Sequence, residues 1–347
     1  MNKAKNGEEI TIGFFGGSIT QGSLASNEKR CYAYRVFQWW ESTYPNAKCH
    51  YVNGGIGGTS SHFGVARVKD DLLIYQPDFV VVDFSVNDEA NEFYKETFEG
   101  LIRKVLYSQP CKAVLILNNV FYDTGLNAQD YHNEVAAHYQ IPCVSMRDTV
   151  YAEMKKGRYT REELTPDGLH PNDRGHQLVA DEIIKLLEKV KAEFEKDGLE
   201  HKDSSCGRPI TANAYEKAQL LNITNCFPKL SGFFVDAQEK QGHLDIFKNG
   251  WIGKKQGDRI CFELECACIA VQYRKTIQQP SPVARLKLDG TDTFILDGNF
   301  EETWGDCLYL GDILHQGVSK THTVEIEIIQ ATMEDKVPFY LTALIVA

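Results

Sequence analysis

The fold of this chain is decided by one stretch near its start, Gly13-Phe14-Phe15-Gly16-Gly17-Ser18-Ile19-Thr20-Gln21-Gly22. The apolar residues 10–15 predict a short buried strand, and the paired glycines after them predict a sharp turn. Ser18 would then lie just past the carboxyl end of a buried strand, which is where open α/β sheets form their ligand crevice. Taken alone, a serine beside glycines is more typical of an ordinary turn, so the rest of the chain has to decide its meaning.

Strand and helix patterns alternate through the first part of the chain. Apolar runs typical of strands buried on both faces occupy residues 10–15, 51–53, 79–84, 113–117 and 142–145. Helical patterns occupy residues 28–44, 65–75, 97–108, 129–139 and 173–196. In the last of these, Leu178, Val179, Ile183 and Leu187 fall on one apolar stripe. The alternation predicts an α/β domain over residues 1–200, with a parallel sheet between two layers of helices.

A second domain is predicted from the change of character near residue 200. Residues 197–209 are polar and rich in turn formers, as a linker should be. Beyond them, short strand patterns occupy residues 231–236, 259–266, 269–273, 284–288, 294–296, 323–328 and 340–346. Asp289-Gly290 and Asp297-Gly298 are typical of hairpin turns. Closely spaced strands with little helix predict a β-sandwich over residues 208–347.

Composition argues against several classes of function. The chain has 347 residues, enough for two cores, and its net charge of -11 argues against nucleic acid as a partner, because phosphate binding needs clustered Lys and Arg. No run approaches the ~20 apolar residues of a membrane span. The first residues form no apolar secretory segment, and the ten cysteines lack paired zinc-like spacing. Reduced thiols, a cytoplasmic location and no catalytic metal are therefore expected.

Three later stretches lie where a strand or helix gives way to a loop. They are Asn53-Gly54-Gly55-Ile56-Gly57-Gly58-Thr59, Val81-Val82-Asp83-Phe84-Ser85-Val86-Asn87-Asp88 and Asp167-Gly168-Leu169-His170-Pro171. Together with the first stretch they resemble, in the same order, the four sequence blocks of the SGNH (GDSL-type) serine hydrolases. The resemblance covers residues 1–200. It implies a three-layer, flavodoxin-like α/β fold and acyl-transfer chemistry that needs no cofactor.

The residues themselves supply the groups that acyl transfer needs, which are a nucleophile, a base and a group that orients the base. Ser18 offers the hydroxyl. His170 is the candidate base, because it lies in a carboxylate-x-x-His loop just before a strong helix. Asp167, three residues earlier, can fold back to accept the Nδ1–H of His170, which leaves Nε2 to face the serine.

Three donors are predicted for the oxyanion: the N–H of Ser18, the N–H of Gly58 and the side-chain amide of Asn87. In the SGNH family the block-one serine, the block-two glycine and the block-three asparagine are the oxyanion donors, and the block-five histidine is the base. The resemblance places these roles on Ser18, Gly58, Asn87 and His170, with Asp167 as the orienting acid. Each residue alone has another reading. Asn87 with Asp88 could cap the next helix, and Asp167 could be a turn residue.

The chain departs from the family pattern in two of the blocks. The usual Gly-Asp-Ser of the first block has Gly17 in place of the aspartate, and the usual Gly-x-Asn-Asp reads Ser85-Val86-Asn87-Asp88. Neither change removes a catalytic atom, but both alter the backbone support of Ser18 and Asn87. A catalytically silent binding protein, with a nucleophile turn altered by Gly17, therefore remains an alternative.

The predicted second domain indicates the substrate. Sugar faces are bound by aromatic stacking together with hydrogen bonds. Trp304, in a polar loop, is the candidate sugar platform, and a place in the core or at a domain interface is its alternative. Asn119, after the fourth strand pattern, could contact a sugar or could support its own loop.

The two-domain layout resembles the bacterial cytoplasmic carbohydrate acetylesterases of the carbohydrate esterase family seventeen type. In that family an SGNH domain is joined to a jelly-roll domain that resembles a carbohydrate-binding module. The resemblance implies removal of 2-O-acetyl groups from acetylated manno-oligosaccharides. A xylo-oligosaccharide acetylesterase and a small-acyl esterase or thioesterase are the alternatives. Nothing in the sequence indicates an oligomeric state.

Overall fold

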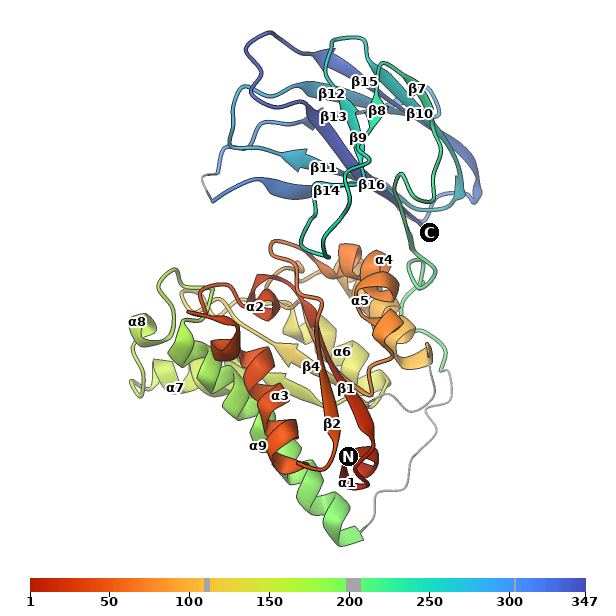
Figure 1. Ribbon diagram of the computed structural model, residues 1–347. Helices are drawn as coiled ribbons and strands as arrows, with labels where there is room; N and C mark the ends of the chain where they lie inside the picture. The colour runs from red at the N-terminus through yellow and green to blue at the C-terminus, as the bar shows by residue number, and fades with distance from the viewer. Residues whose placement is uncertain (109–112, 198–206, 303) are drawn as a thin grey trace. The chain divides into compact units, whose positions relative to one another are not determined.

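The chain folds as two compact units, Met1–Glu216 and Lys217–Ala347 (Figure 1). The computed structural model describes residues 1–108, 113–197, 207–302 and 304–347. Most of the predicted linker, residues 198–206, lies outside the described residues. The segment after it packs on the first unit, because Glu99 accepts the backbone N–H of Ile210 at 2.8 Å and of Thr211 at 2.9 Å. Residues 207–216 thus belong with the first unit by their contacts.

A five-stranded parallel sheet forms the centre of the first unit, in the order β2-β1-β3-β4-β5. The strands are β1 (Glu9–Gly16), β2 (Lys48–Asn53), β3 (Phe79–Asp83), β4 (Ala113–Asn118) and β5 (Cys143–Ser145). This is the flavodoxin-like strand order, in which ligands bind outside the carboxyl ends of the strands, next to the point where the order reverses. The predicted sheet is confirmed, and the end of β1 lies at that point.

Helices cover both faces of this sheet (Figure 1). One face carries α3 (Tyr32–Thr43) and α9 (Asp173–Asp197), and the other carries α4 (Ser61–Asp71), α5 (Glu92–Tyr107) and α6 (Gln129–His138). The shorter helical elements are α1 (Asn2–Lys5), α2 (Ser18–Gln21), η1 (Glu28–Arg30), η2 (Leu73–Tyr75), η3 (Arg147–Tyr151), α7 (Ala152–Lys155) and α8 (Arg161–Leu164). Among the described helices, none combines the length and the apolar character needed to cross a membrane.

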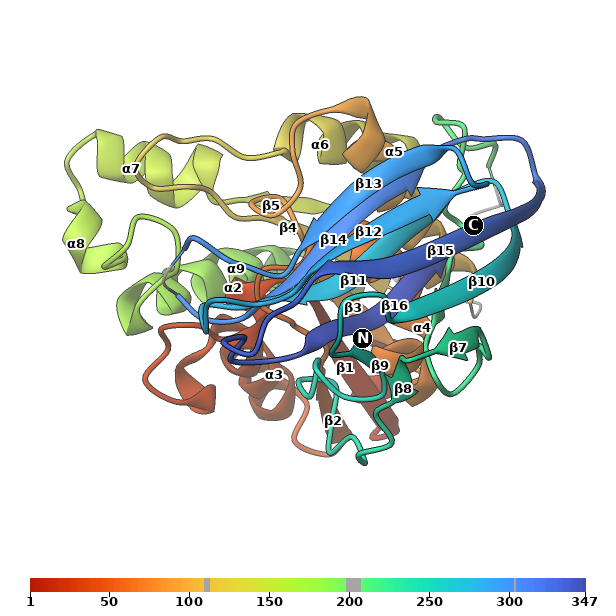
Figure 2. The same ribbon diagram turned by 90° about the horizontal axis from the view of Figure 1, so that it is seen from above.

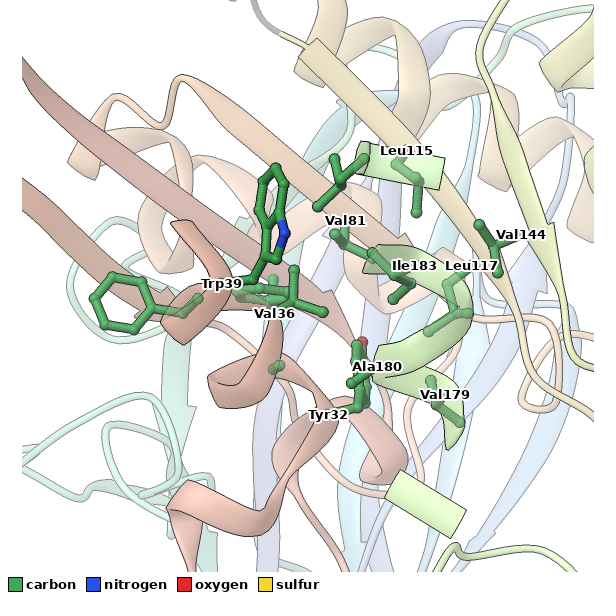
Figure 3. Close-up of a cluster of buried hydrophobic side chains, with 14 of the residues drawn as sticks. Tyr32, Val36, Trp39, Val81, Leu115, Leu117, Val144, Val179, Ala180 and Ile183 are labelled. Carbon is green, nitrogen blue, oxygen red and sulfur yellow. The ribbon is translucent and has the colours of Figure 1, made fainter. Parts of the chain in front are cut away.

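The core beneath α3 and α9 explains why these two helices form and where they lie. Figure 3 shows side chains from α3, from α9 and from the strands meeting in one cluster, among them Tyr32, Val36, Trp39, Val81, Leu115, Leu117, Val144, Val179, Ala180 and Ile183. The apolar stripe predicted on the last helix is the face of α9 that is buried here. Full burial of a large apolar side chain stabilises the fold by about 1.5–3 kcal/mol, so this stripe fixes α9 on the sheet.

The second unit consists of two antiparallel sheets (Figure 2). One has the order β13-β12-β15-β10-β7 and the other β14-β11-β16-β9-β8, with β6 also paired to β16. The strands are β6 (Gln219–Leu221), β7 (Lys229–Ser231), β8 (Phe234–Val235), β9 (Trp251–Gly253), β10 (Arg259–Cys266), β11 (Ile269–Lys275), β12 (Val283–Leu288), β13 (Asp292–Asp297), β14 (Cys307–Leu314), β15 (Lys320–Gln330) and β16 (Phe339–Val346). Alternate residues of β10, β12 and β15 are buried, and with Val271 and Leu341 of the facing sheet they form one core. The predicted sandwich is confirmed.

Two local predictions for this unit are wrong. The single strand predicted over residues 231–236 is two strands in different sheets, β7 and β8, because the chain turns between them at Gly232, where φ is +94°. Asp297-Gly298 does not close a hairpin, since β13 is followed by β14 of the opposite sheet. Strands β6, β9 and β14 were not predicted, and two of them are only three residues long.

Candidate active site

Ser18 lies at the turn that links β1 to α2. Strand β1 ends at Gly16, Gly17 is the residue before the helix, and Ser18 is the first residue of α2. The N–H of Gly17 donates to the carbonyl oxygen of Asp83 at 3.3 Å, which ties the turn to the end of β3. A Cβ at Gly16 would collide with that same carbonyl oxygen and with Thr20. The close approach of the ends of β1 and β3 therefore requires glycine at position 16.

Ser18, His170 and Asp167 form a continuous hydrogen-bonded chain, although His170 is far from Ser18 in the sequence. The Oγ of Ser18 lies 2.8 Å from Nε2 of His170, and Nδ1 of His170 lies 2.7 Å from Oδ2 of Asp167. Ser18 is 8% exposed and therefore buried. The structure thus brings together the three residues predicted as nucleophile, base and orienting acid.

The surroundings of Asp167 determine which of the three hydrogen-bonded residues carry a proton. Burial alone would raise the pKa of Asp167, but hydrogen bonds from the His170 ring and from the backbone N–H groups of Leu169 and His170 lower it to about 2. Asp167 is therefore ionised at neutral pH and accepts the Nδ1–H of His170. The Nε2 atom is left as an acceptor for the hydroxyl proton of Ser18.

The three predicted oxyanion donors make no hydrogen bond within the part of the chain that the structure describes. The N–H of Ser18, the N–H of Gly58 and the side-chain amide of Asn87 have no hydrogen-bond partner among the described residues. A Cβ at Gly17 would collide with the Asn87 amide, so that amide lies against the nucleophile turn. Gly58 adopts φ +66°, which favours glycine. Its neighbour Gly57 lies beside Ser18, since a Cβ there would be 3.6 Å from the Ser18 Cβ.

Comparison with known proteins agrees with this geometry. The model of the GDSL-like Lipase/Acylhydrolase family matches residues 14–178. The solved structure of a two-domain esterase active on acetylated mannans, co-crystallized with mannopentaose, is 47% identical, and the match covers 99% of this chain and 92% of that chain with a TM-score of 0.95. The chain belongs to the GDSL-like lipase/acylhydrolase family. It is a carboxylic ester hydrolase.

Two further relatives match about half of this acylhydrolase. The acetylxylan esterase of Geobacillus stearothermophilus is 25% identical over 215 residues, which is 53% of this chain and 96% of the relative. Thioesterase 1/protease 1/lysophospholipase L1 of Escherichia coli (strain K12) is 24% identical over 161 residues, which is 44% of this chain and 71% of the relative. These alignments extend over about half of this chain, whereas the two-domain esterase matches it almost throughout.

Asp83 is a buried acid of this acylhydrolase that sequence analysis did not single out. Its Oδ2 accepts from Thr20 Oγ1 at 3.0 Å and from the Asn119 amide at 2.8 Å, while Oδ1 has no partner among the described residues. Burial raises the pKa of Asp83 to about 7, against the effect of these two hydrogen bonds. A single acid at the end of the apolar run 79–84 was the signal that could have identified it.

The two residues predicted to bind substrate have different surroundings. Asn119 is 1% exposed and its amide is bonded to Asp83, so in this structure the side chain supports the strand ends and offers no surface to a sugar. Trp304 lies between β13 and β14 and is 59% exposed, which excludes a place in the core of the second unit. Its Nε1–H donates to Glu302 at 2.6 Å, and its ring meets Phe300 edge to face.

Within the ranges that the structure describes, there is no group of three or more His, Cys, Asp or Glu side chains that could hold a metal ion.

Proposed function

We propose that this acylhydrolase removes O-acetyl groups from acetylated oligosaccharides, with 2-O-acetylated manno-oligosaccharides as its substrates. The observation that carries the proposal is the hydrogen-bonded chain from Ser18 through His170 to Asp167 in a protein that matches an acetylmannan esterase over both units. The 2-position is implied by the resemblance to the family seventeen esterases. Ser18, His170 and Asp167 are the catalytic residues of this proposal.

The reaction proceeds in two acyl-transfer steps. Nε2 of His170 takes the hydroxyl proton of Ser18 as Oγ attacks the acetyl carbonyl carbon. The oxyanion that forms is stabilised by the N–H groups of Ser18 and Gly58 and by the Asn87 amide, and each such donor contributes about 3 kcal/mol. His170 then protonates the departing sugar oxygen. Water hydrolyses the acetyl-serine by the same route.

The second unit is the proposed carbohydrate-binding domain, and the first unit is the catalytic domain. Trp304 presents an exposed indole in a loop with polar neighbours. Such a ring can stack on the apolar face of a pyranose while its edge remains hydrogen bonded, here to Glu302. The relative that matches both units is active on acetylated mannans, whereas the acetylxylan esterase matches only 53% of this chain. The mannan preference is therefore attributed to the second unit.

A cytoplasmic location is part of the proposal. The described cysteines, among them Cys31 and Cys266, form no disulfide. Several cysteines without a disulfide are typical of proteins in reducing compartments. The substrates would then be oligosaccharides that have already entered the cell.

Thioesterase activity is the second candidate function, since one relative that matches 44% of this chain is a thioesterase. The same serine chemistry would cleave an acyl thioester. The two functions differ in the leaving group that the protein must recognise, which is a sugar alcohol in one and the thiol of coenzyme A in the other. Acyl-coenzyme A hydrolysis in the absence of acetyl-glycan hydrolysis would favour this second candidate.

The test is acetate release from acetylated mannan and acetylated xylan oligosaccharides. Ser18→Ala should lower kcat by about 10⁴-fold or more and leave the melting temperature nearly unchanged, because only the nucleophile is lost. A Ser18→Ala enzyme with most of its activity would refute the serine mechanism.

Trp304→Ala should raise KM for the mannan substrate about 2- to 10-fold while activity on a small aryl acetate is retained, because one stacking contact contributes roughly 0.5–1.5 kcal/mol. Phe227→Ala is the matched control, since Phe227 is an exposed aromatic of the same unit, 87% exposed. Equal effects of the two substitutions, or none for Trp304→Ala, would remove Trp304 from the proposal.

A further inference from the structure

The two loop donors of the site come from different strand ends, and one buried carboxylate connects them. Gly58 belongs to the loop between β2 and α4, and Asn87 belongs to the turn after β3. Asp88, directly after Asn87, is 6% exposed, and its Oδ1 accepts the backbone N–H of Ser61 at 2.8 Å. Ser61 is the first residue of α4, three positions after Gly58. The hydrogen bond thereby fixes the end of the loop that carries Gly58 to the turn that carries Asn87.

This contact replaces a local helix cap. Ser60 is the residue before α4, and its side chain makes no capping hydrogen bond. Asp88 supplies the acceptor instead, so the start of α4 is held by another segment of the chain. The intervening Thr59 is fixed as well, because its hydroxyl donates to the Ile56 carbonyl oxygen at 2.7 Å. The path from Asp88 to Gly58 thus passes only through residues in defined contacts.

The other oxygen of Asp88 is also used. Oδ2 lies 3.0 Å from Nε2 of His132, a fully buried histidine of α6. The His132 ring is stacked on Phe98 of α5, with centroids 3.6 Å apart and the rings 6° from parallel. On the backbone side, the N–H groups of Asn87 and Asp88 both donate to the Phe84 carbonyl oxygen at 2.9 Å. The carboxylate has both oxygens bonded and its backbone fixed, so it has little freedom to rotate.

We propose that Asp88 is the positioning residue that sets the Gly58 N–H and the Asn87 amide at the separation that the oxyanion requires. Asp88 does not touch the substrate and acts through its two neighbours. The inference rests on the proposed function, because it needs those two donors to act on an oxyanion. Preorganised donors contribute to catalysis only if they are in place before charge develops, and this is what a rigid link between the loops provides.

The first test is Asp88→Asn, which keeps the shape of the side chain but replaces one acceptor oxygen by a donor. It should lower kcat for an aryl acetate about 10- to 100-fold and leave KM within about 3-fold, less than the 10²–10³-fold for loss of a whole donor. Glu99→Gln is the control, since Glu99 is an equally buried carboxylate that accepts two backbone N–H groups. It should lower stability and leave kcat unchanged.

A second pair of variants tests the link without changing Asp88. Ser61→Pro removes the N–H that Asp88 accepts, and proline is favoured at the first position of a helix. The preceding Ser60 has φ -95° and ψ 174°, which suits a residue before proline. Ser61→Ala is the matched control, because both substitutions lose the hydroxyl contact with Thr97 and only the proline loses the N–H. A lower kcat for Ser61→Pro than for Ser61→Ala is expected.

The inference is overturned if Asp88→Asn and Ser61→Pro keep the kcat of their controls, or if Asp88→Asn and Asn87→Ala combine with fully multiplicative losses. Coupled residues should instead give a double variant that is faster than the product of the single losses. Failure of the proposed function has a different signature. An unimpaired Asn87→Ala would remove the oxyanion assignment itself, whereas an impaired Asn87→Ala with a normal Asp88→Asn would remove only the positioning role.

Discussion

At the scale of single residues, Gly17 explains the departure of this chain from the family's first block. A side chain at position 17, such as the aspartate of the usual Gly-Asp-Ser, would place its Cβ on the Oδ1 of Asn87. The glycine thus leaves room for the amide that we assign to the oxyanion. On this view Gly17 does not weaken the nucleophile turn, and the alternative of a catalytically silent protein loses the observation that favoured it.

Gly17→Ala should therefore lower kcat by about 10²-fold, the loss expected when one oxyanion donor is displaced, with little change in KM or melting temperature. The measurement is the rate of aryl acetate hydrolysis under saturating substrate. In an Asn87→Ala background the same substitution should have no further effect, because the side chain that it displaces is absent. A further slowing of that background by Gly17→Ala would contradict the explanation.

At the scale of elements, the sequence predicted those whose signal is local. The buried strands β1 and β3 lie within one or two residues of their predicted bounds, because each is an apolar run ended by a turn. Helix α4 was predicted over residues 65–75 but spans Ser61–Asp71. Its first turn contains Gly64 and has no local cap, and it is held by Asp88 from another segment. A contact of this kind cannot be read from the helix's own sequence.

The candidate site divides in the same way. Ser18, Asp167 and His170 were found because each lies in a short motif whose chemistry is visible in its residue types. The support roles of Asp83 and Asn119 depend on burial and on neighbours from β1, β3 and β4, which only the folded chain brings together. For Asn119 the sequence left a sugar contact and a role in supporting its own loop open, and in the folded chain its amide donates to Asp83.

At the scale of the whole molecule, two buried groups of the first unit make opposite contributions to stability as the pH changes. Burial lowers the pKa of His176 to about 4 from an ordinary 6.5, and burial raises the pKa of Asp83 to about 7 from 3.8. Between about pH 4 and 6.5 the unfolded chain binds a proton at His176 that the folded chain does not, so this group makes stability rise with pH. In the same window the folded chain binds a proton at Asp83 that the unfolded chain lacks, so stability falls with pH. The two slopes offset each other.

If either group is removed, the pH dependence of the free energy of unfolding should show the contribution of the other group alone. Relative to the unsubstituted protein, Asp83→Asn should make the free energy of unfolding rise more steeply with pH between about 4.5 and 6.5, by about 1.4 kcal/mol per pH unit. His176→Gln should change the slope by the same amount in the opposite direction. Urea unfolding followed by the far-UV helix signal is the measurement, because all the described helices lie in the first unit. Parallel pH profiles for the three proteins would show that neither group changes its protonation on folding, since a shift on folding is the only source of these slopes.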